Sequence, residues 1–505
     1  MNCTNQTKTG LLFRVLCLVL GCLLIIPALA ACGGGGEVPG ETTPVTTPSG
    51  NGSDSSVSTG GDEEDPGGDP NAVPQPIMED FDGFEFRVLS RGSGSWTSDD
   101  IIGNITGTIV DQAVFNRNEK LMAQYNFVIK ETKDANWTDT ARVLGQAGEA
   151  AYEMWSFRMN DMPSLGQEGY LWNLNEVDGL NLDAVYYDQN NREMGSFNNY
   201  LFFLTGDMLY MDDMATQIIT FNRDLFNQFL LEDVYGKDLY DLVRDHEWTL
   251  EVMQEFCRIA TQDRNGDDVM RPEDDYYGFS YENPNILGFN ISCGNLLLEK
   301  DENDIFVLNV EQKMIDDLQR IMTFFNAGYS AGSTYQESRW LYGTQLFYPQ
   351  WIKNLPASKS SGLNFGVVPM PLGSTDQQEY RGMITTYGSN CITICSTVDG
   401  EDLDKAANII ELLSYESMQS VTPKLEEYLL AGRVVSEAAD AEMLEIALDG
   451  KSYELCYLWS TGSLYSTMIA LNNADGIGIA SALDGCKSAV EASVQRKLDR
   501  LNKLG

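Results

Sequence analysis

The sequence predicts a mixed α/β fold, and three consecutive patterns in the chain support this prediction. Residues 84–90 alternate apolar and polar side chains, as a half-buried strand does. Val114, Leu121 and Tyr125 then recur at helical spacing. A second strand pattern follows at 125–131, and a strand, a helix and a strand within about 50 residues form a βαβ unit with parallel strands. The chain has 505 residues, more than the roughly 250–300 that one hydrophobic core serves, so we expect two lobes.

Apolar stripes and a cap predict further helices. One stripe covers 314–325 and another covers 403–413, both at the spacing of a helix face that packs on a core. Thr249 precedes the apolar segment 250–260 and should cap a helix there, with Glu251 near the positive end of the helix dipole. We interpret these stripes as core faces rather than cofactor sites.

The first 31 residues have the parts of a secretory signal. Lys8 and Arg14 precede an apolar run over 15–31, and no acidic residue occurs before Glu37. The run is shorter than the roughly 20 apolar residues of a bilayer span. A basic start, a short apolar run and small residues at its end are typical of a cleaved export signal.

The end of this run resembles a bacterial lipobox. The residues are Leu29, Ala30, Ala31 and Cys32. The resemblance implies cleavage before Cys32 and attachment of lipid to its sulfur, which would hold the protein on the extracellular face of the cell membrane. Secretion without lipid and a retained span are the alternatives.

Residues 32–79 are expected to form a flexible tether. Gly, Ser, Thr, Pro and acidic residues dominate 33–77, and no aromatic residue occurs there. Such a segment cannot bury enough apolar surface to offset the entropy of ordering it. We therefore predict a spacer between the lipid and the folded lobes.

The charge of the chain excludes one class of partner. It carries 75 Asp and Glu against 33 Lys and Arg, a formal net charge of −42. So acidic a protein is poorly suited to nucleic-acid phosphates. It would also not adsorb to an anionic membrane surface without a covalent anchor.

Six cysteines follow Cys32, and none forms a CxxC pair. They are Cys257, Cys293, Cys391, Cys395, Cys456 and Cys486. We interpret them as buried thiols that act as small apolar residues. Disulfides are the alternative, because an extracellular location permits them. A metal site at these cysteines is disfavoured because the one histidine, His246, is remote in sequence.

Several segments together resemble one protein family. They are 81–92, 111–129, 206–229, 238–256, 263–279, 365–373 and 406–429. In this order they are similar to the extracellular solute-binding proteins of ABC importers, the large Gram-positive lipoproteins that usually capture sugars or oligosaccharides. This chain departs from the family at Tyr186, Tyr187 and Asp188, where a pair of tryptophans often precedes an acid.

The resemblance implies a two-lobe periplasmic-binding-protein-like α/β fold with a central cleft and hinge strands. It places lobe 1 at 80–213 plus 390–452 and lobe 2 at 214–389 plus 453–505. The chain would cross between lobes near 212–217, 385–390 and 450–458. It also implies a monomer without catalytic residues or a required cofactor, which binds a sugar or oligosaccharide and docks on the membrane subunits of an ABC permease.

Ligand-binding candidates are aromatic, acidic or amide residues in irregular segments near the expected crossings. Sugars present flat C–H faces to aromatic rings, and carboxylates and amides bind their hydroxyl groups. The candidates are Trp96, Tyr210, Asp212, Asp213, Trp340, Tyr387, Asn390 and Trp459. For each one, core packing is the alternative. Trp172, Trp248 and Trp351 are expected in the core, and Trp137 and Trp155 stay open.

An acidic loop has the spacing of a calcium site. Side-chain oxygens of Asp263, Asn265, Asp267 and Asp274, with the Val269 carbonyl, would supply positions 1, 3, 5, 12 and 7 of such a loop. Asp268 stands where glycine is usual, and Asp274 is shorter than the usual glutamate. The alternative is a solvated loop held by Asx turns. Any calcium here would be structural.

Two other classes of function stay open. One is a surface glycoside hydrolase or other carbohydrate-active enzyme, and the other is a non-transporting surface adhesin or sensor of the same fold. Asp212 and Asp213 could be taken for a general acid and base. Adjacent residues of a strand point to opposite faces, however, so they rarely serve one bond.

Overall fold

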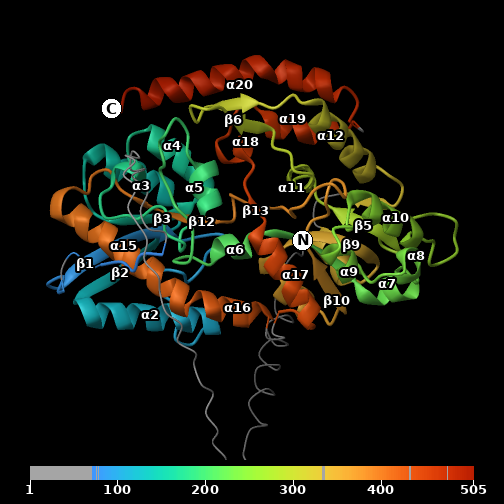
Figure 1. Ribbon diagram of the computed structural model, residues 1–505, viewed down its shortest axis with the longest axis horizontal. Coiled ribbons are helices and arrows are strands. Elements are labelled where there is room, and N and C mark those ends of the chain that lie inside the picture. The colour runs from blue at the N-terminus through green and yellow to red at the C-terminus, as the bar shows by residue number, and fades with distance from the viewer. Residues whose placement is uncertain are drawn as a thin grey trace, which may run out of the picture. The chain divides into compact units, whose positions relative to one another are not determined.

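Figure 1 shows the protein as a computed structural model, which describes residues 71–504 apart from 76, 78, 333–335, 431–433 and 475. The predicted signal sequence, Cys32 and residues 33–70 of the predicted tether lie outside the described residues. At the end of that tether, the Ile77 amide donates to Asn408 Oδ1 at 3.0 Å, and Asn408 Nδ2 donates to the Gln75 carbonyl at 3.2 Å. This part of the tether is therefore bound to a helix.

The first sheet has the order β12-β3-β1-β2. Its strands are β1 (Phe84–Arg91), β2 (Phe127–Asp134), β3 (Met154–Arg158) and β12 (Asn390–Ile394). β1 pairs in parallel with β2 and with β3, and β12 runs antiparallel to β3. The predicted βαβ unit is confirmed, because α2 (Ile109–Tyr125) connects β1 to β2.

The second sheet has the order β10-β4-β9-β5-β8. Its strands are β4 (Gln217–Asn222), β5 (Tyr277–Tyr281), β8 (Ser330–Gly332), β9 (Gln345–Trp351) and β10 (Phe365–Val368). β4 is antiparallel to both of its neighbours, whereas β5 is parallel to β8 and β9. Two short ribbons pair β11 (Gly382–Met383) with β13 (Lys451–Ser452), and β6 (Leu298–Lys300) with β7 (Phe306–Leu308).

Helices cover both sheets. The longer ones are α3 (Trp137–Ala147), α10 (Leu250–Ala260), α11 (Asn285–Ser292), α12 (Gln312–Phe325), α15 (Gly400–Ser420), α16 (Thr422–Leu430), α17 (Ala438–Asp449), α19 (Leu464–Asn472) and α20 (Ile479–Leu501). The shorter ones are α4 (Met162–Gln167), α5 (Gln189–Gly195), α6 (Met211–Met214), α7 (Arg223–Gln228), α8 (Glu232–Tyr235), α9 (Leu239–Arg244), α13 (Gln336–Leu341), α14 (Leu355–Ser360) and α18 (Leu455–Leu458). Three 3₁₀ turns are η1 (Met159–Asp161), η2 (Leu174–Glu176) and η3 (Ile352–Asn354). Within the described part of the chain, none of these helices has the length and apolar character of a membrane span.

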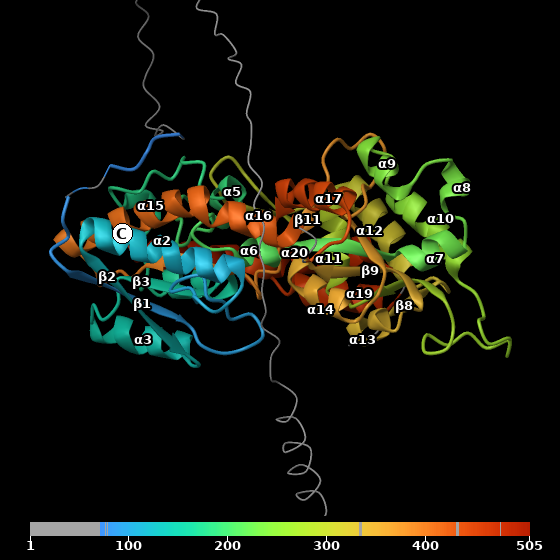
Figure 2. The same ribbon diagram turned by 90° about the horizontal axis from the view of Figure 1, so that it is seen from below.

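The predicted helices at 250–260, 314–325 and 403–413 are confirmed as α10, α12 and α15. The Thr249 side chain accepts a hydrogen bond from the Val252 amide and so caps α10 as expected. Figure 2 shows α2 and α15 on one face of the first sheet and α3 on the other. α15 and α16 both pack on α2, whereas α10 packs on β5 and α17 on β10.

All six cysteines that follow the predicted tether are buried free thiols. The interpretation of these residues as small apolar side chains is confirmed, and the disulfide alternative is wrong. Burial raises the pKa of the Cys257 and Cys391 thiols well above their ordinary range.

Segments that connect the two sheets lie side by side. The Thr385 amide donates to the Ala215 carbonyl at 3.0 Å, and the Ile384 amide donates to the Ser452 carbonyl at 2.8 Å. Residue 215 lies between β3 and β4 in the chain, and residues 384–385 lie between β10 and β12. These bonded segments have the arrangement of a hinge, and the lobe boundaries themselves stay a prediction.

Two buried carboxyl groups make the stability of the fold depend on pH. Asp100 and Glu454 are each 1% exposed. Burial raises the pKa of Asp100 to about 7 and that of Glu454 to about 7. Each carboxyl therefore keeps a proton in the folded state after the unfolded chain has released it. Their contribution to stability is complete below about pH 4, the ordinary pKa, and is lost as the pH rises through about 7.

We expect the free energy of unfolding to fall by about 1.4 kcal/mol per pH unit for each of these carboxyls between about pH 5 and pH 7. Combining Asp100→Asn with Glu454→Gln should flatten this slope, measured by urea unfolding at a series of pH values. Glu302→Gln changes an exposed acid and should keep the slope of the unaltered protein. If the double variant had the same slope as the unaltered protein, the prediction would be contradicted.

Candidate functional site

Two arginines end neighbouring parallel strands of the first sheet. Arg91 is the last residue of β1 and Arg158 is the last residue of β3. Because β1 and β3 are parallel, both side chains lie at the same carboxyl edge, where open α/β sheets bind their ligands. Arg91 is only 4% exposed, whereas the Arg158 side chain is 23% exposed.

Two aromatic rings flank these arginines. Arg158 Cζ lies 4.9 Å from the ring centroid of Tyr387 and 5.2 Å from that of Trp137. Arg91 Cζ lies 5.7 Å and 5.5 Å from the same two centroids. Cation–π attraction at these distances holds the charges and the rings together. Tyr387 is still 47% exposed, so part of its ring is available to a ligand.

The two arginines differ in their partners. Arg158 Nε and Nη2 donate to Asp161 at 3.0 Å and 2.8 Å, and Trp137 Nε1 donates to the same carboxylate at 2.8 Å. Arg91 instead donates to the carbonyls of Ser93 and Tyr387, both at 3.2 Å. The charge of Arg158 is thus balanced by a carboxylate, whereas Arg91 is held by neutral groups.

The second sheet contributes to the same place. Trp351 ends β9, and its ring centroid lies 6.4 Å from that of Trp96, which follows β1. Lys353, in η3, places Nζ 4.3 Å from the Trp96 ring centroid. A Cβ at Gly388 would lie 2.7 Å from the Trp96 ring, so this ring rests on the connecting segment 384–389. Groups from both sheets and from the hinge therefore meet here.

We call this set the aromatic–cation site. Its residues are Arg91, Trp96, Trp137, Arg158, Trp351, Lys353 and Tyr387. Tyr457 lies close to Asn160, whose Nδ2 donates to the Tyr457 carbonyl at 3.2 Å, and burial raises the pKa of the Tyr457 hydroxyl to about 12.

Polar atoms near the aromatic–cation site have hydrogen-bonding capacity to spare. Asn160 Oδ1, Lys353 Nζ, Thr386 Oγ1 and Asn390 Oδ1 are buried, and none has a hydrogen-bond partner among the described residues. Buried polar atoms are ordinarily paired. A polar ligand with several hydroxyl groups would satisfy such atoms.

The structure brings three predicted ligand-binding residues together at this site. Trp96 and Tyr387 belong to it, and Asn390 begins β12 opposite Arg158 in the register of the sheet. Asn390 Nδ2 donates to Ser98 Oγ at 3.2 Å. Contact of these residues with a ligand stays a prediction.

Tyr210, Asp212 and Asp213 make their hydrogen bonds and ion pairs with residues outside the aromatic–cation site. Tyr210 donates to Asp111 Oδ1 at 2.8 Å. Lys451 Nζ lies 2.7 Å from Asp213 Oδ1 and 3.4 Å from Asp212 Oδ2. The paired carboxylates therefore hold a lysine next to the hinge, a structural arrangement.

Trp340 and Trp459 are buried in apolar clusters. Trp340 is 0% exposed, and its Nε1 donates to Ser358 Oγ at 2.9 Å. Trp459 is 3% exposed, and its ring lies 5.3 Å from that of Phe197 and 5.5 Å from that of Phe306. This geometry favours the alternative for both residues, which is core packing.

The tyrosine pair at the departure from the family is also buried. The hydroxyl groups of Tyr186 and Tyr187 both donate to Glu411. These rings are 1% and 3% exposed and do not reach the aromatic–cation site.

Most residues of the aromatic–cation site were missed by sequence reasoning. Its apolar sequence context predicts a core position for Trp351 and does not decide the position of Trp137, and no sequence pattern described above points to Arg91, Arg158 or Lys353. One usable signal existed: Arg91 directly follows the predicted strand 84–90, and a charged residue there lies at the ligand-binding edge of a parallel sheet.

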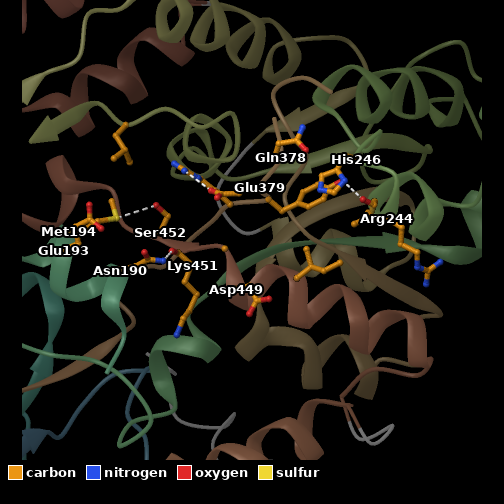
Figure 3. Close-up of a pocket in the computed structure, with 16 residues that line it drawn as sticks. Asn190, Glu193, Met194, Arg244, His246, Gln378, Glu379, Asp449, Lys451 and Ser452 are labelled. Atoms are coloured by element: carbon orange, nitrogen blue, oxygen red, sulfur yellow. Dashed lines mark hydrogen bonds and ion pairs between the residues drawn. The ribbon is translucent and has the colours of Figure 1, made fainter. Parts of the chain in front are cut away.

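A separate hollow of about 740 Å³ borders β11 and β13. Figure 3 shows its lining, in which Lys451 points toward α6. Its arginine and lysine side chains have carboxylate partners: Arg244 binds Glu442, Arg381 binds Glu379, and Lys451 binds Asp213. Tyr380 is the one tyrosine or tryptophan among the described residues of the lining, and it is buried beside His246. The hollow thus offers few open rings and is less suited to a saccharide than the aromatic–cation site.

The predicted calcium loop folds on its own backbone. Asp263 accepts from the amides of Gly266 and Asp268 at 2.6 Å and 2.8 Å, and Asn265 accepts from the Asp267 amide at 2.9 Å. Arg271 pairs with Asp267 at 2.5 Å. The described residues contain no cluster of three or more metal-ligating side chains, so this arrangement corresponds to the Asx-turn alternative.

Calcium binding by this loop stays a prediction with its own test. If Asp263, Asn265, Asp267, Val269 and Asp274 bind calcium, saturating calcium should raise the melting temperature of chelator-treated protein, because ligands of the folded state stabilise it. Asp263→Ala should abolish the increase. An unchanged melting temperature in the unaltered protein would contradict the prediction.

Comparison with known proteins identifies the fold. No protein-family model matches the chain, and no curated protein matches it. Among solved structures, the cyclic alpha-maltosyl-1,6-maltose binding protein of Arthrobacter globiformis is similar, with a TM-score of 0.55 and 12% identity over 82% of this chain and 100% of that chain. An ABC substrate-binding protein of Listeria monocytogenes, in complex with cycloalternan, gives a TM-score of 0.52 and 11% identity over 82% and 100%. The maltose-binding periplasmic protein of Listeria monocytogenes, in complex with maltose, gives 0.52 and 11% over 82% and 99%.

The predicted fold class is therefore confirmed. The protein has the two-lobe α/β fold of periplasmic binding proteins, with one sheet in each lobe and hinge segments between them.

Proposed function

We propose that this protein is an extracellular substrate-binding protein that captures a saccharide at the aromatic–cation site and delivers it to an ABC importer. The observation that supports this most is the convergence of Trp96 and Tyr387 with Trp351, which come from the two sheets and the hinge. Open rings and unpaired hydrogen-bonding atoms in one place suit the C–H faces and hydroxyl groups of a sugar. Two of the similar solved structures are described as binding proteins for maltose or for cyclic maltosyl-maltose, and the third is in complex with cycloalternan.

The mechanism is capture by closure of the lobes. A ligand that contacts both sheets favours the closed form, because it binds that form more tightly than the open one. The bonded segments around Thr385 and Ser452 would absorb the motion. The closed monomer would then dock on the membrane subunits of a permease, and no bond of the saccharide would be broken.

We further propose that the lipid on Cys32 and the tether hold the protein at the extracellular face of the membrane. The support is the basic start, the short apolar run and the lipobox-like Leu29 to Cys32. Tethering raises the effective concentration of the captured saccharide near the permease.

A thermal-shift screen tests the proposed function. Mono- and oligosaccharides, peptides and polyols are added to the purified protein at about 100 times an expected Kd, where binding stabilises by about 2.7 kcal/mol. We expect a saccharide to raise the melting temperature by several degrees. The proposal would be contradicted if only peptides raised the melting temperature, or if no compound in the screen raised it.

Two further assays separate the other classes of function. Labelled oligosaccharides should be recovered intact after incubation, and released product would favour a carbohydrate-active enzyme. Cells that lack the protein should lose uptake of the captured saccharide, and unchanged uptake would favour a surface adhesin or sensor.

A further inference from the structure

The aromatic–cation site gathers positive charge in a strongly acidic protein. The chain has 75 acidic residues against 33 Lys and Arg, yet Arg91, Arg158 and Lys353 share this site with one neutralising carboxylate, that of Asp161. Asp161 is already bound by Arg158 and Trp137. Two positive charges are therefore left without a counter-charge.

The two cations without a counter-charge are Arg91 and Lys353, and Lys353 has fewer hydrogen bonds than Arg91. Its Nζ is buried and has no hydrogen-bond partner among residues 71–504 that the structure describes. Burial lowers its pKa, and the charge of Arg91 lowers the pKa further. A buried cation without a carboxylate costs free energy in the absence of ligand, so this position is unfavourable for folding alone.

Arg91 has donor capacity in the same place. Its Nε and Nη1 donate to carbonyls, and its Nη2 donates to none of the described residues. Burial lowers the pKa of Arg91 and the charge of Arg158 lowers it further, whereas Tyr387 and the charge of Asp161 raise it in part. Across the described residues no carboxylate lies within ion-pair distance of Arg91 or Lys353, although lysines such as Lys237 and Lys451 each have two or more.

We propose that the saccharide bound at this site is acidic, with a carboxylate of a sugar acid or a sulfate ester held by Arg91 and Lys353. An anion supplies the missing counter-charge, and a guanidinium matches the paired oxygens of such a group. Trp96 and Tyr387 bind the ring that carries it. Since Arg91 ends β1 of the first sheet and Lys353 lies in η3, directly after β9 of the second sheet, the anion bridges the lobes and favours closure. This inference rests on the proposed function and names the substrate class of the same site.

Calorimetric titration of the purified protein tests this inference with three probes of matched length. They are a trisaccharide of galacturonic acid, a sulfated galactose trisaccharide and a neutral galactose trisaccharide. We expect at least one acidic probe to bind roughly tenfold or more tighter than the neutral one, since charged hydrogen bonds are the stronger kind. The two acidic probes distinguish a carboxylate from a sulfate.

Variants of Lys353 test whether this residue causes the preference for an acidic saccharide. Lys353→Met should lower the ratio of acidic to neutral affinity about tenfold, whereas Lys359→Met, which removes the same charge from α14, should leave the ratio unchanged. Lys353→Arg should keep most of the preference. If Lys353→Met does not fold, a salt titration of the unaltered protein takes its place: raising NaCl from about 50 to about 500 mM should weaken the acidic probe more than the neutral one.

The outcomes separate this inference from the proposed function. Equal binding of neutral and acidic probes, or a ratio unchanged by Lys353→Met and by salt, would overturn the acidic-saccharide inference alone. Failure of every saccharide to bind would overturn the proposed function as well.

Discussion

Lys451→Met is expected to lower the free energy of unfolding by about 3–5 kcal/mol, the cost of breaking a buried ion pair by removing one partner. Lys451 Nζ lies within 3.6 Å of carboxylate oxygens of Asp188, Asp212 and Asp213. Burial lowers the pKa of Lys451, the three carboxylates raise it, and the carboxylates prevail. Without the lysine, three acids remain close together in the interior, with Asp212 1% exposed.

Urea unfolding followed by circular dichroism measures this effect. Lys237→Met is the matched control, because Lys237 pairs with Asp245 and Glu247 at the surface, where ion pairs contribute little. Adding Asp213→Asn to Lys451→Met should recover part of the loss. Equal losses in the two lysine variants would show that the buried cluster has no special role.

Tyr387→Ala is expected to weaken saccharide binding roughly 30- to 150-fold, which corresponds to the loss of about 2–3 kcal/mol at an aromatic hot spot. Tyr387 combines an exposed fraction of 47% with cation–π contacts to both Arg91 and Arg158. Its ring is thus held in place and open to a ligand, so little ordering entropy opposes binding.

Calorimetry of the variant with the saccharide found in the thermal-shift screen measures this loss. Tyr342→Ala is the control, since Tyr342 is 80% exposed and lies outside the aromatic–cation site. An affinity unchanged by Tyr387→Ala would remove Tyr387 from the site.

The fold could be predicted from the sequence because local sequence patterns indicate its main helices and strands. The alternation in β1, the stripe of α12 and the Thr249 cap of α10 each depend on neighbouring residues. Hydrophobic periodicity of this kind can be recognised from neighbouring residues alone, without knowing which distant residues are in contact.

The site could be predicted from the sequence only in part, because its residues come from segments that are far apart in the chain. Arg91 and Tyr387 are 296 positions apart, and no local pattern pairs them. Whether a tryptophan is open or buried also depends on its packing partners: Trp96 meets the hinge, whereas Trp340 meets Tyr348 and Phe365 in the core. Sequence context could not separate these two cases.

We expect a bound saccharide to draw the two lobes together at the aromatic–cation site. The most direct test is an electron–electron distance measurement between nitroxide labels at Gln146→Cys on α3 and Ala357→Cys on α14, two exposed positions beside the first and second sheets. A chain that begins at residue 33 lacks Cys32, and the six later cysteines are buried thiols, so labelling is selective. We predict that saturating saccharide shortens the distance between the labels. A distance distribution that stays the same while calorimetry shows the saccharide bound would contradict it.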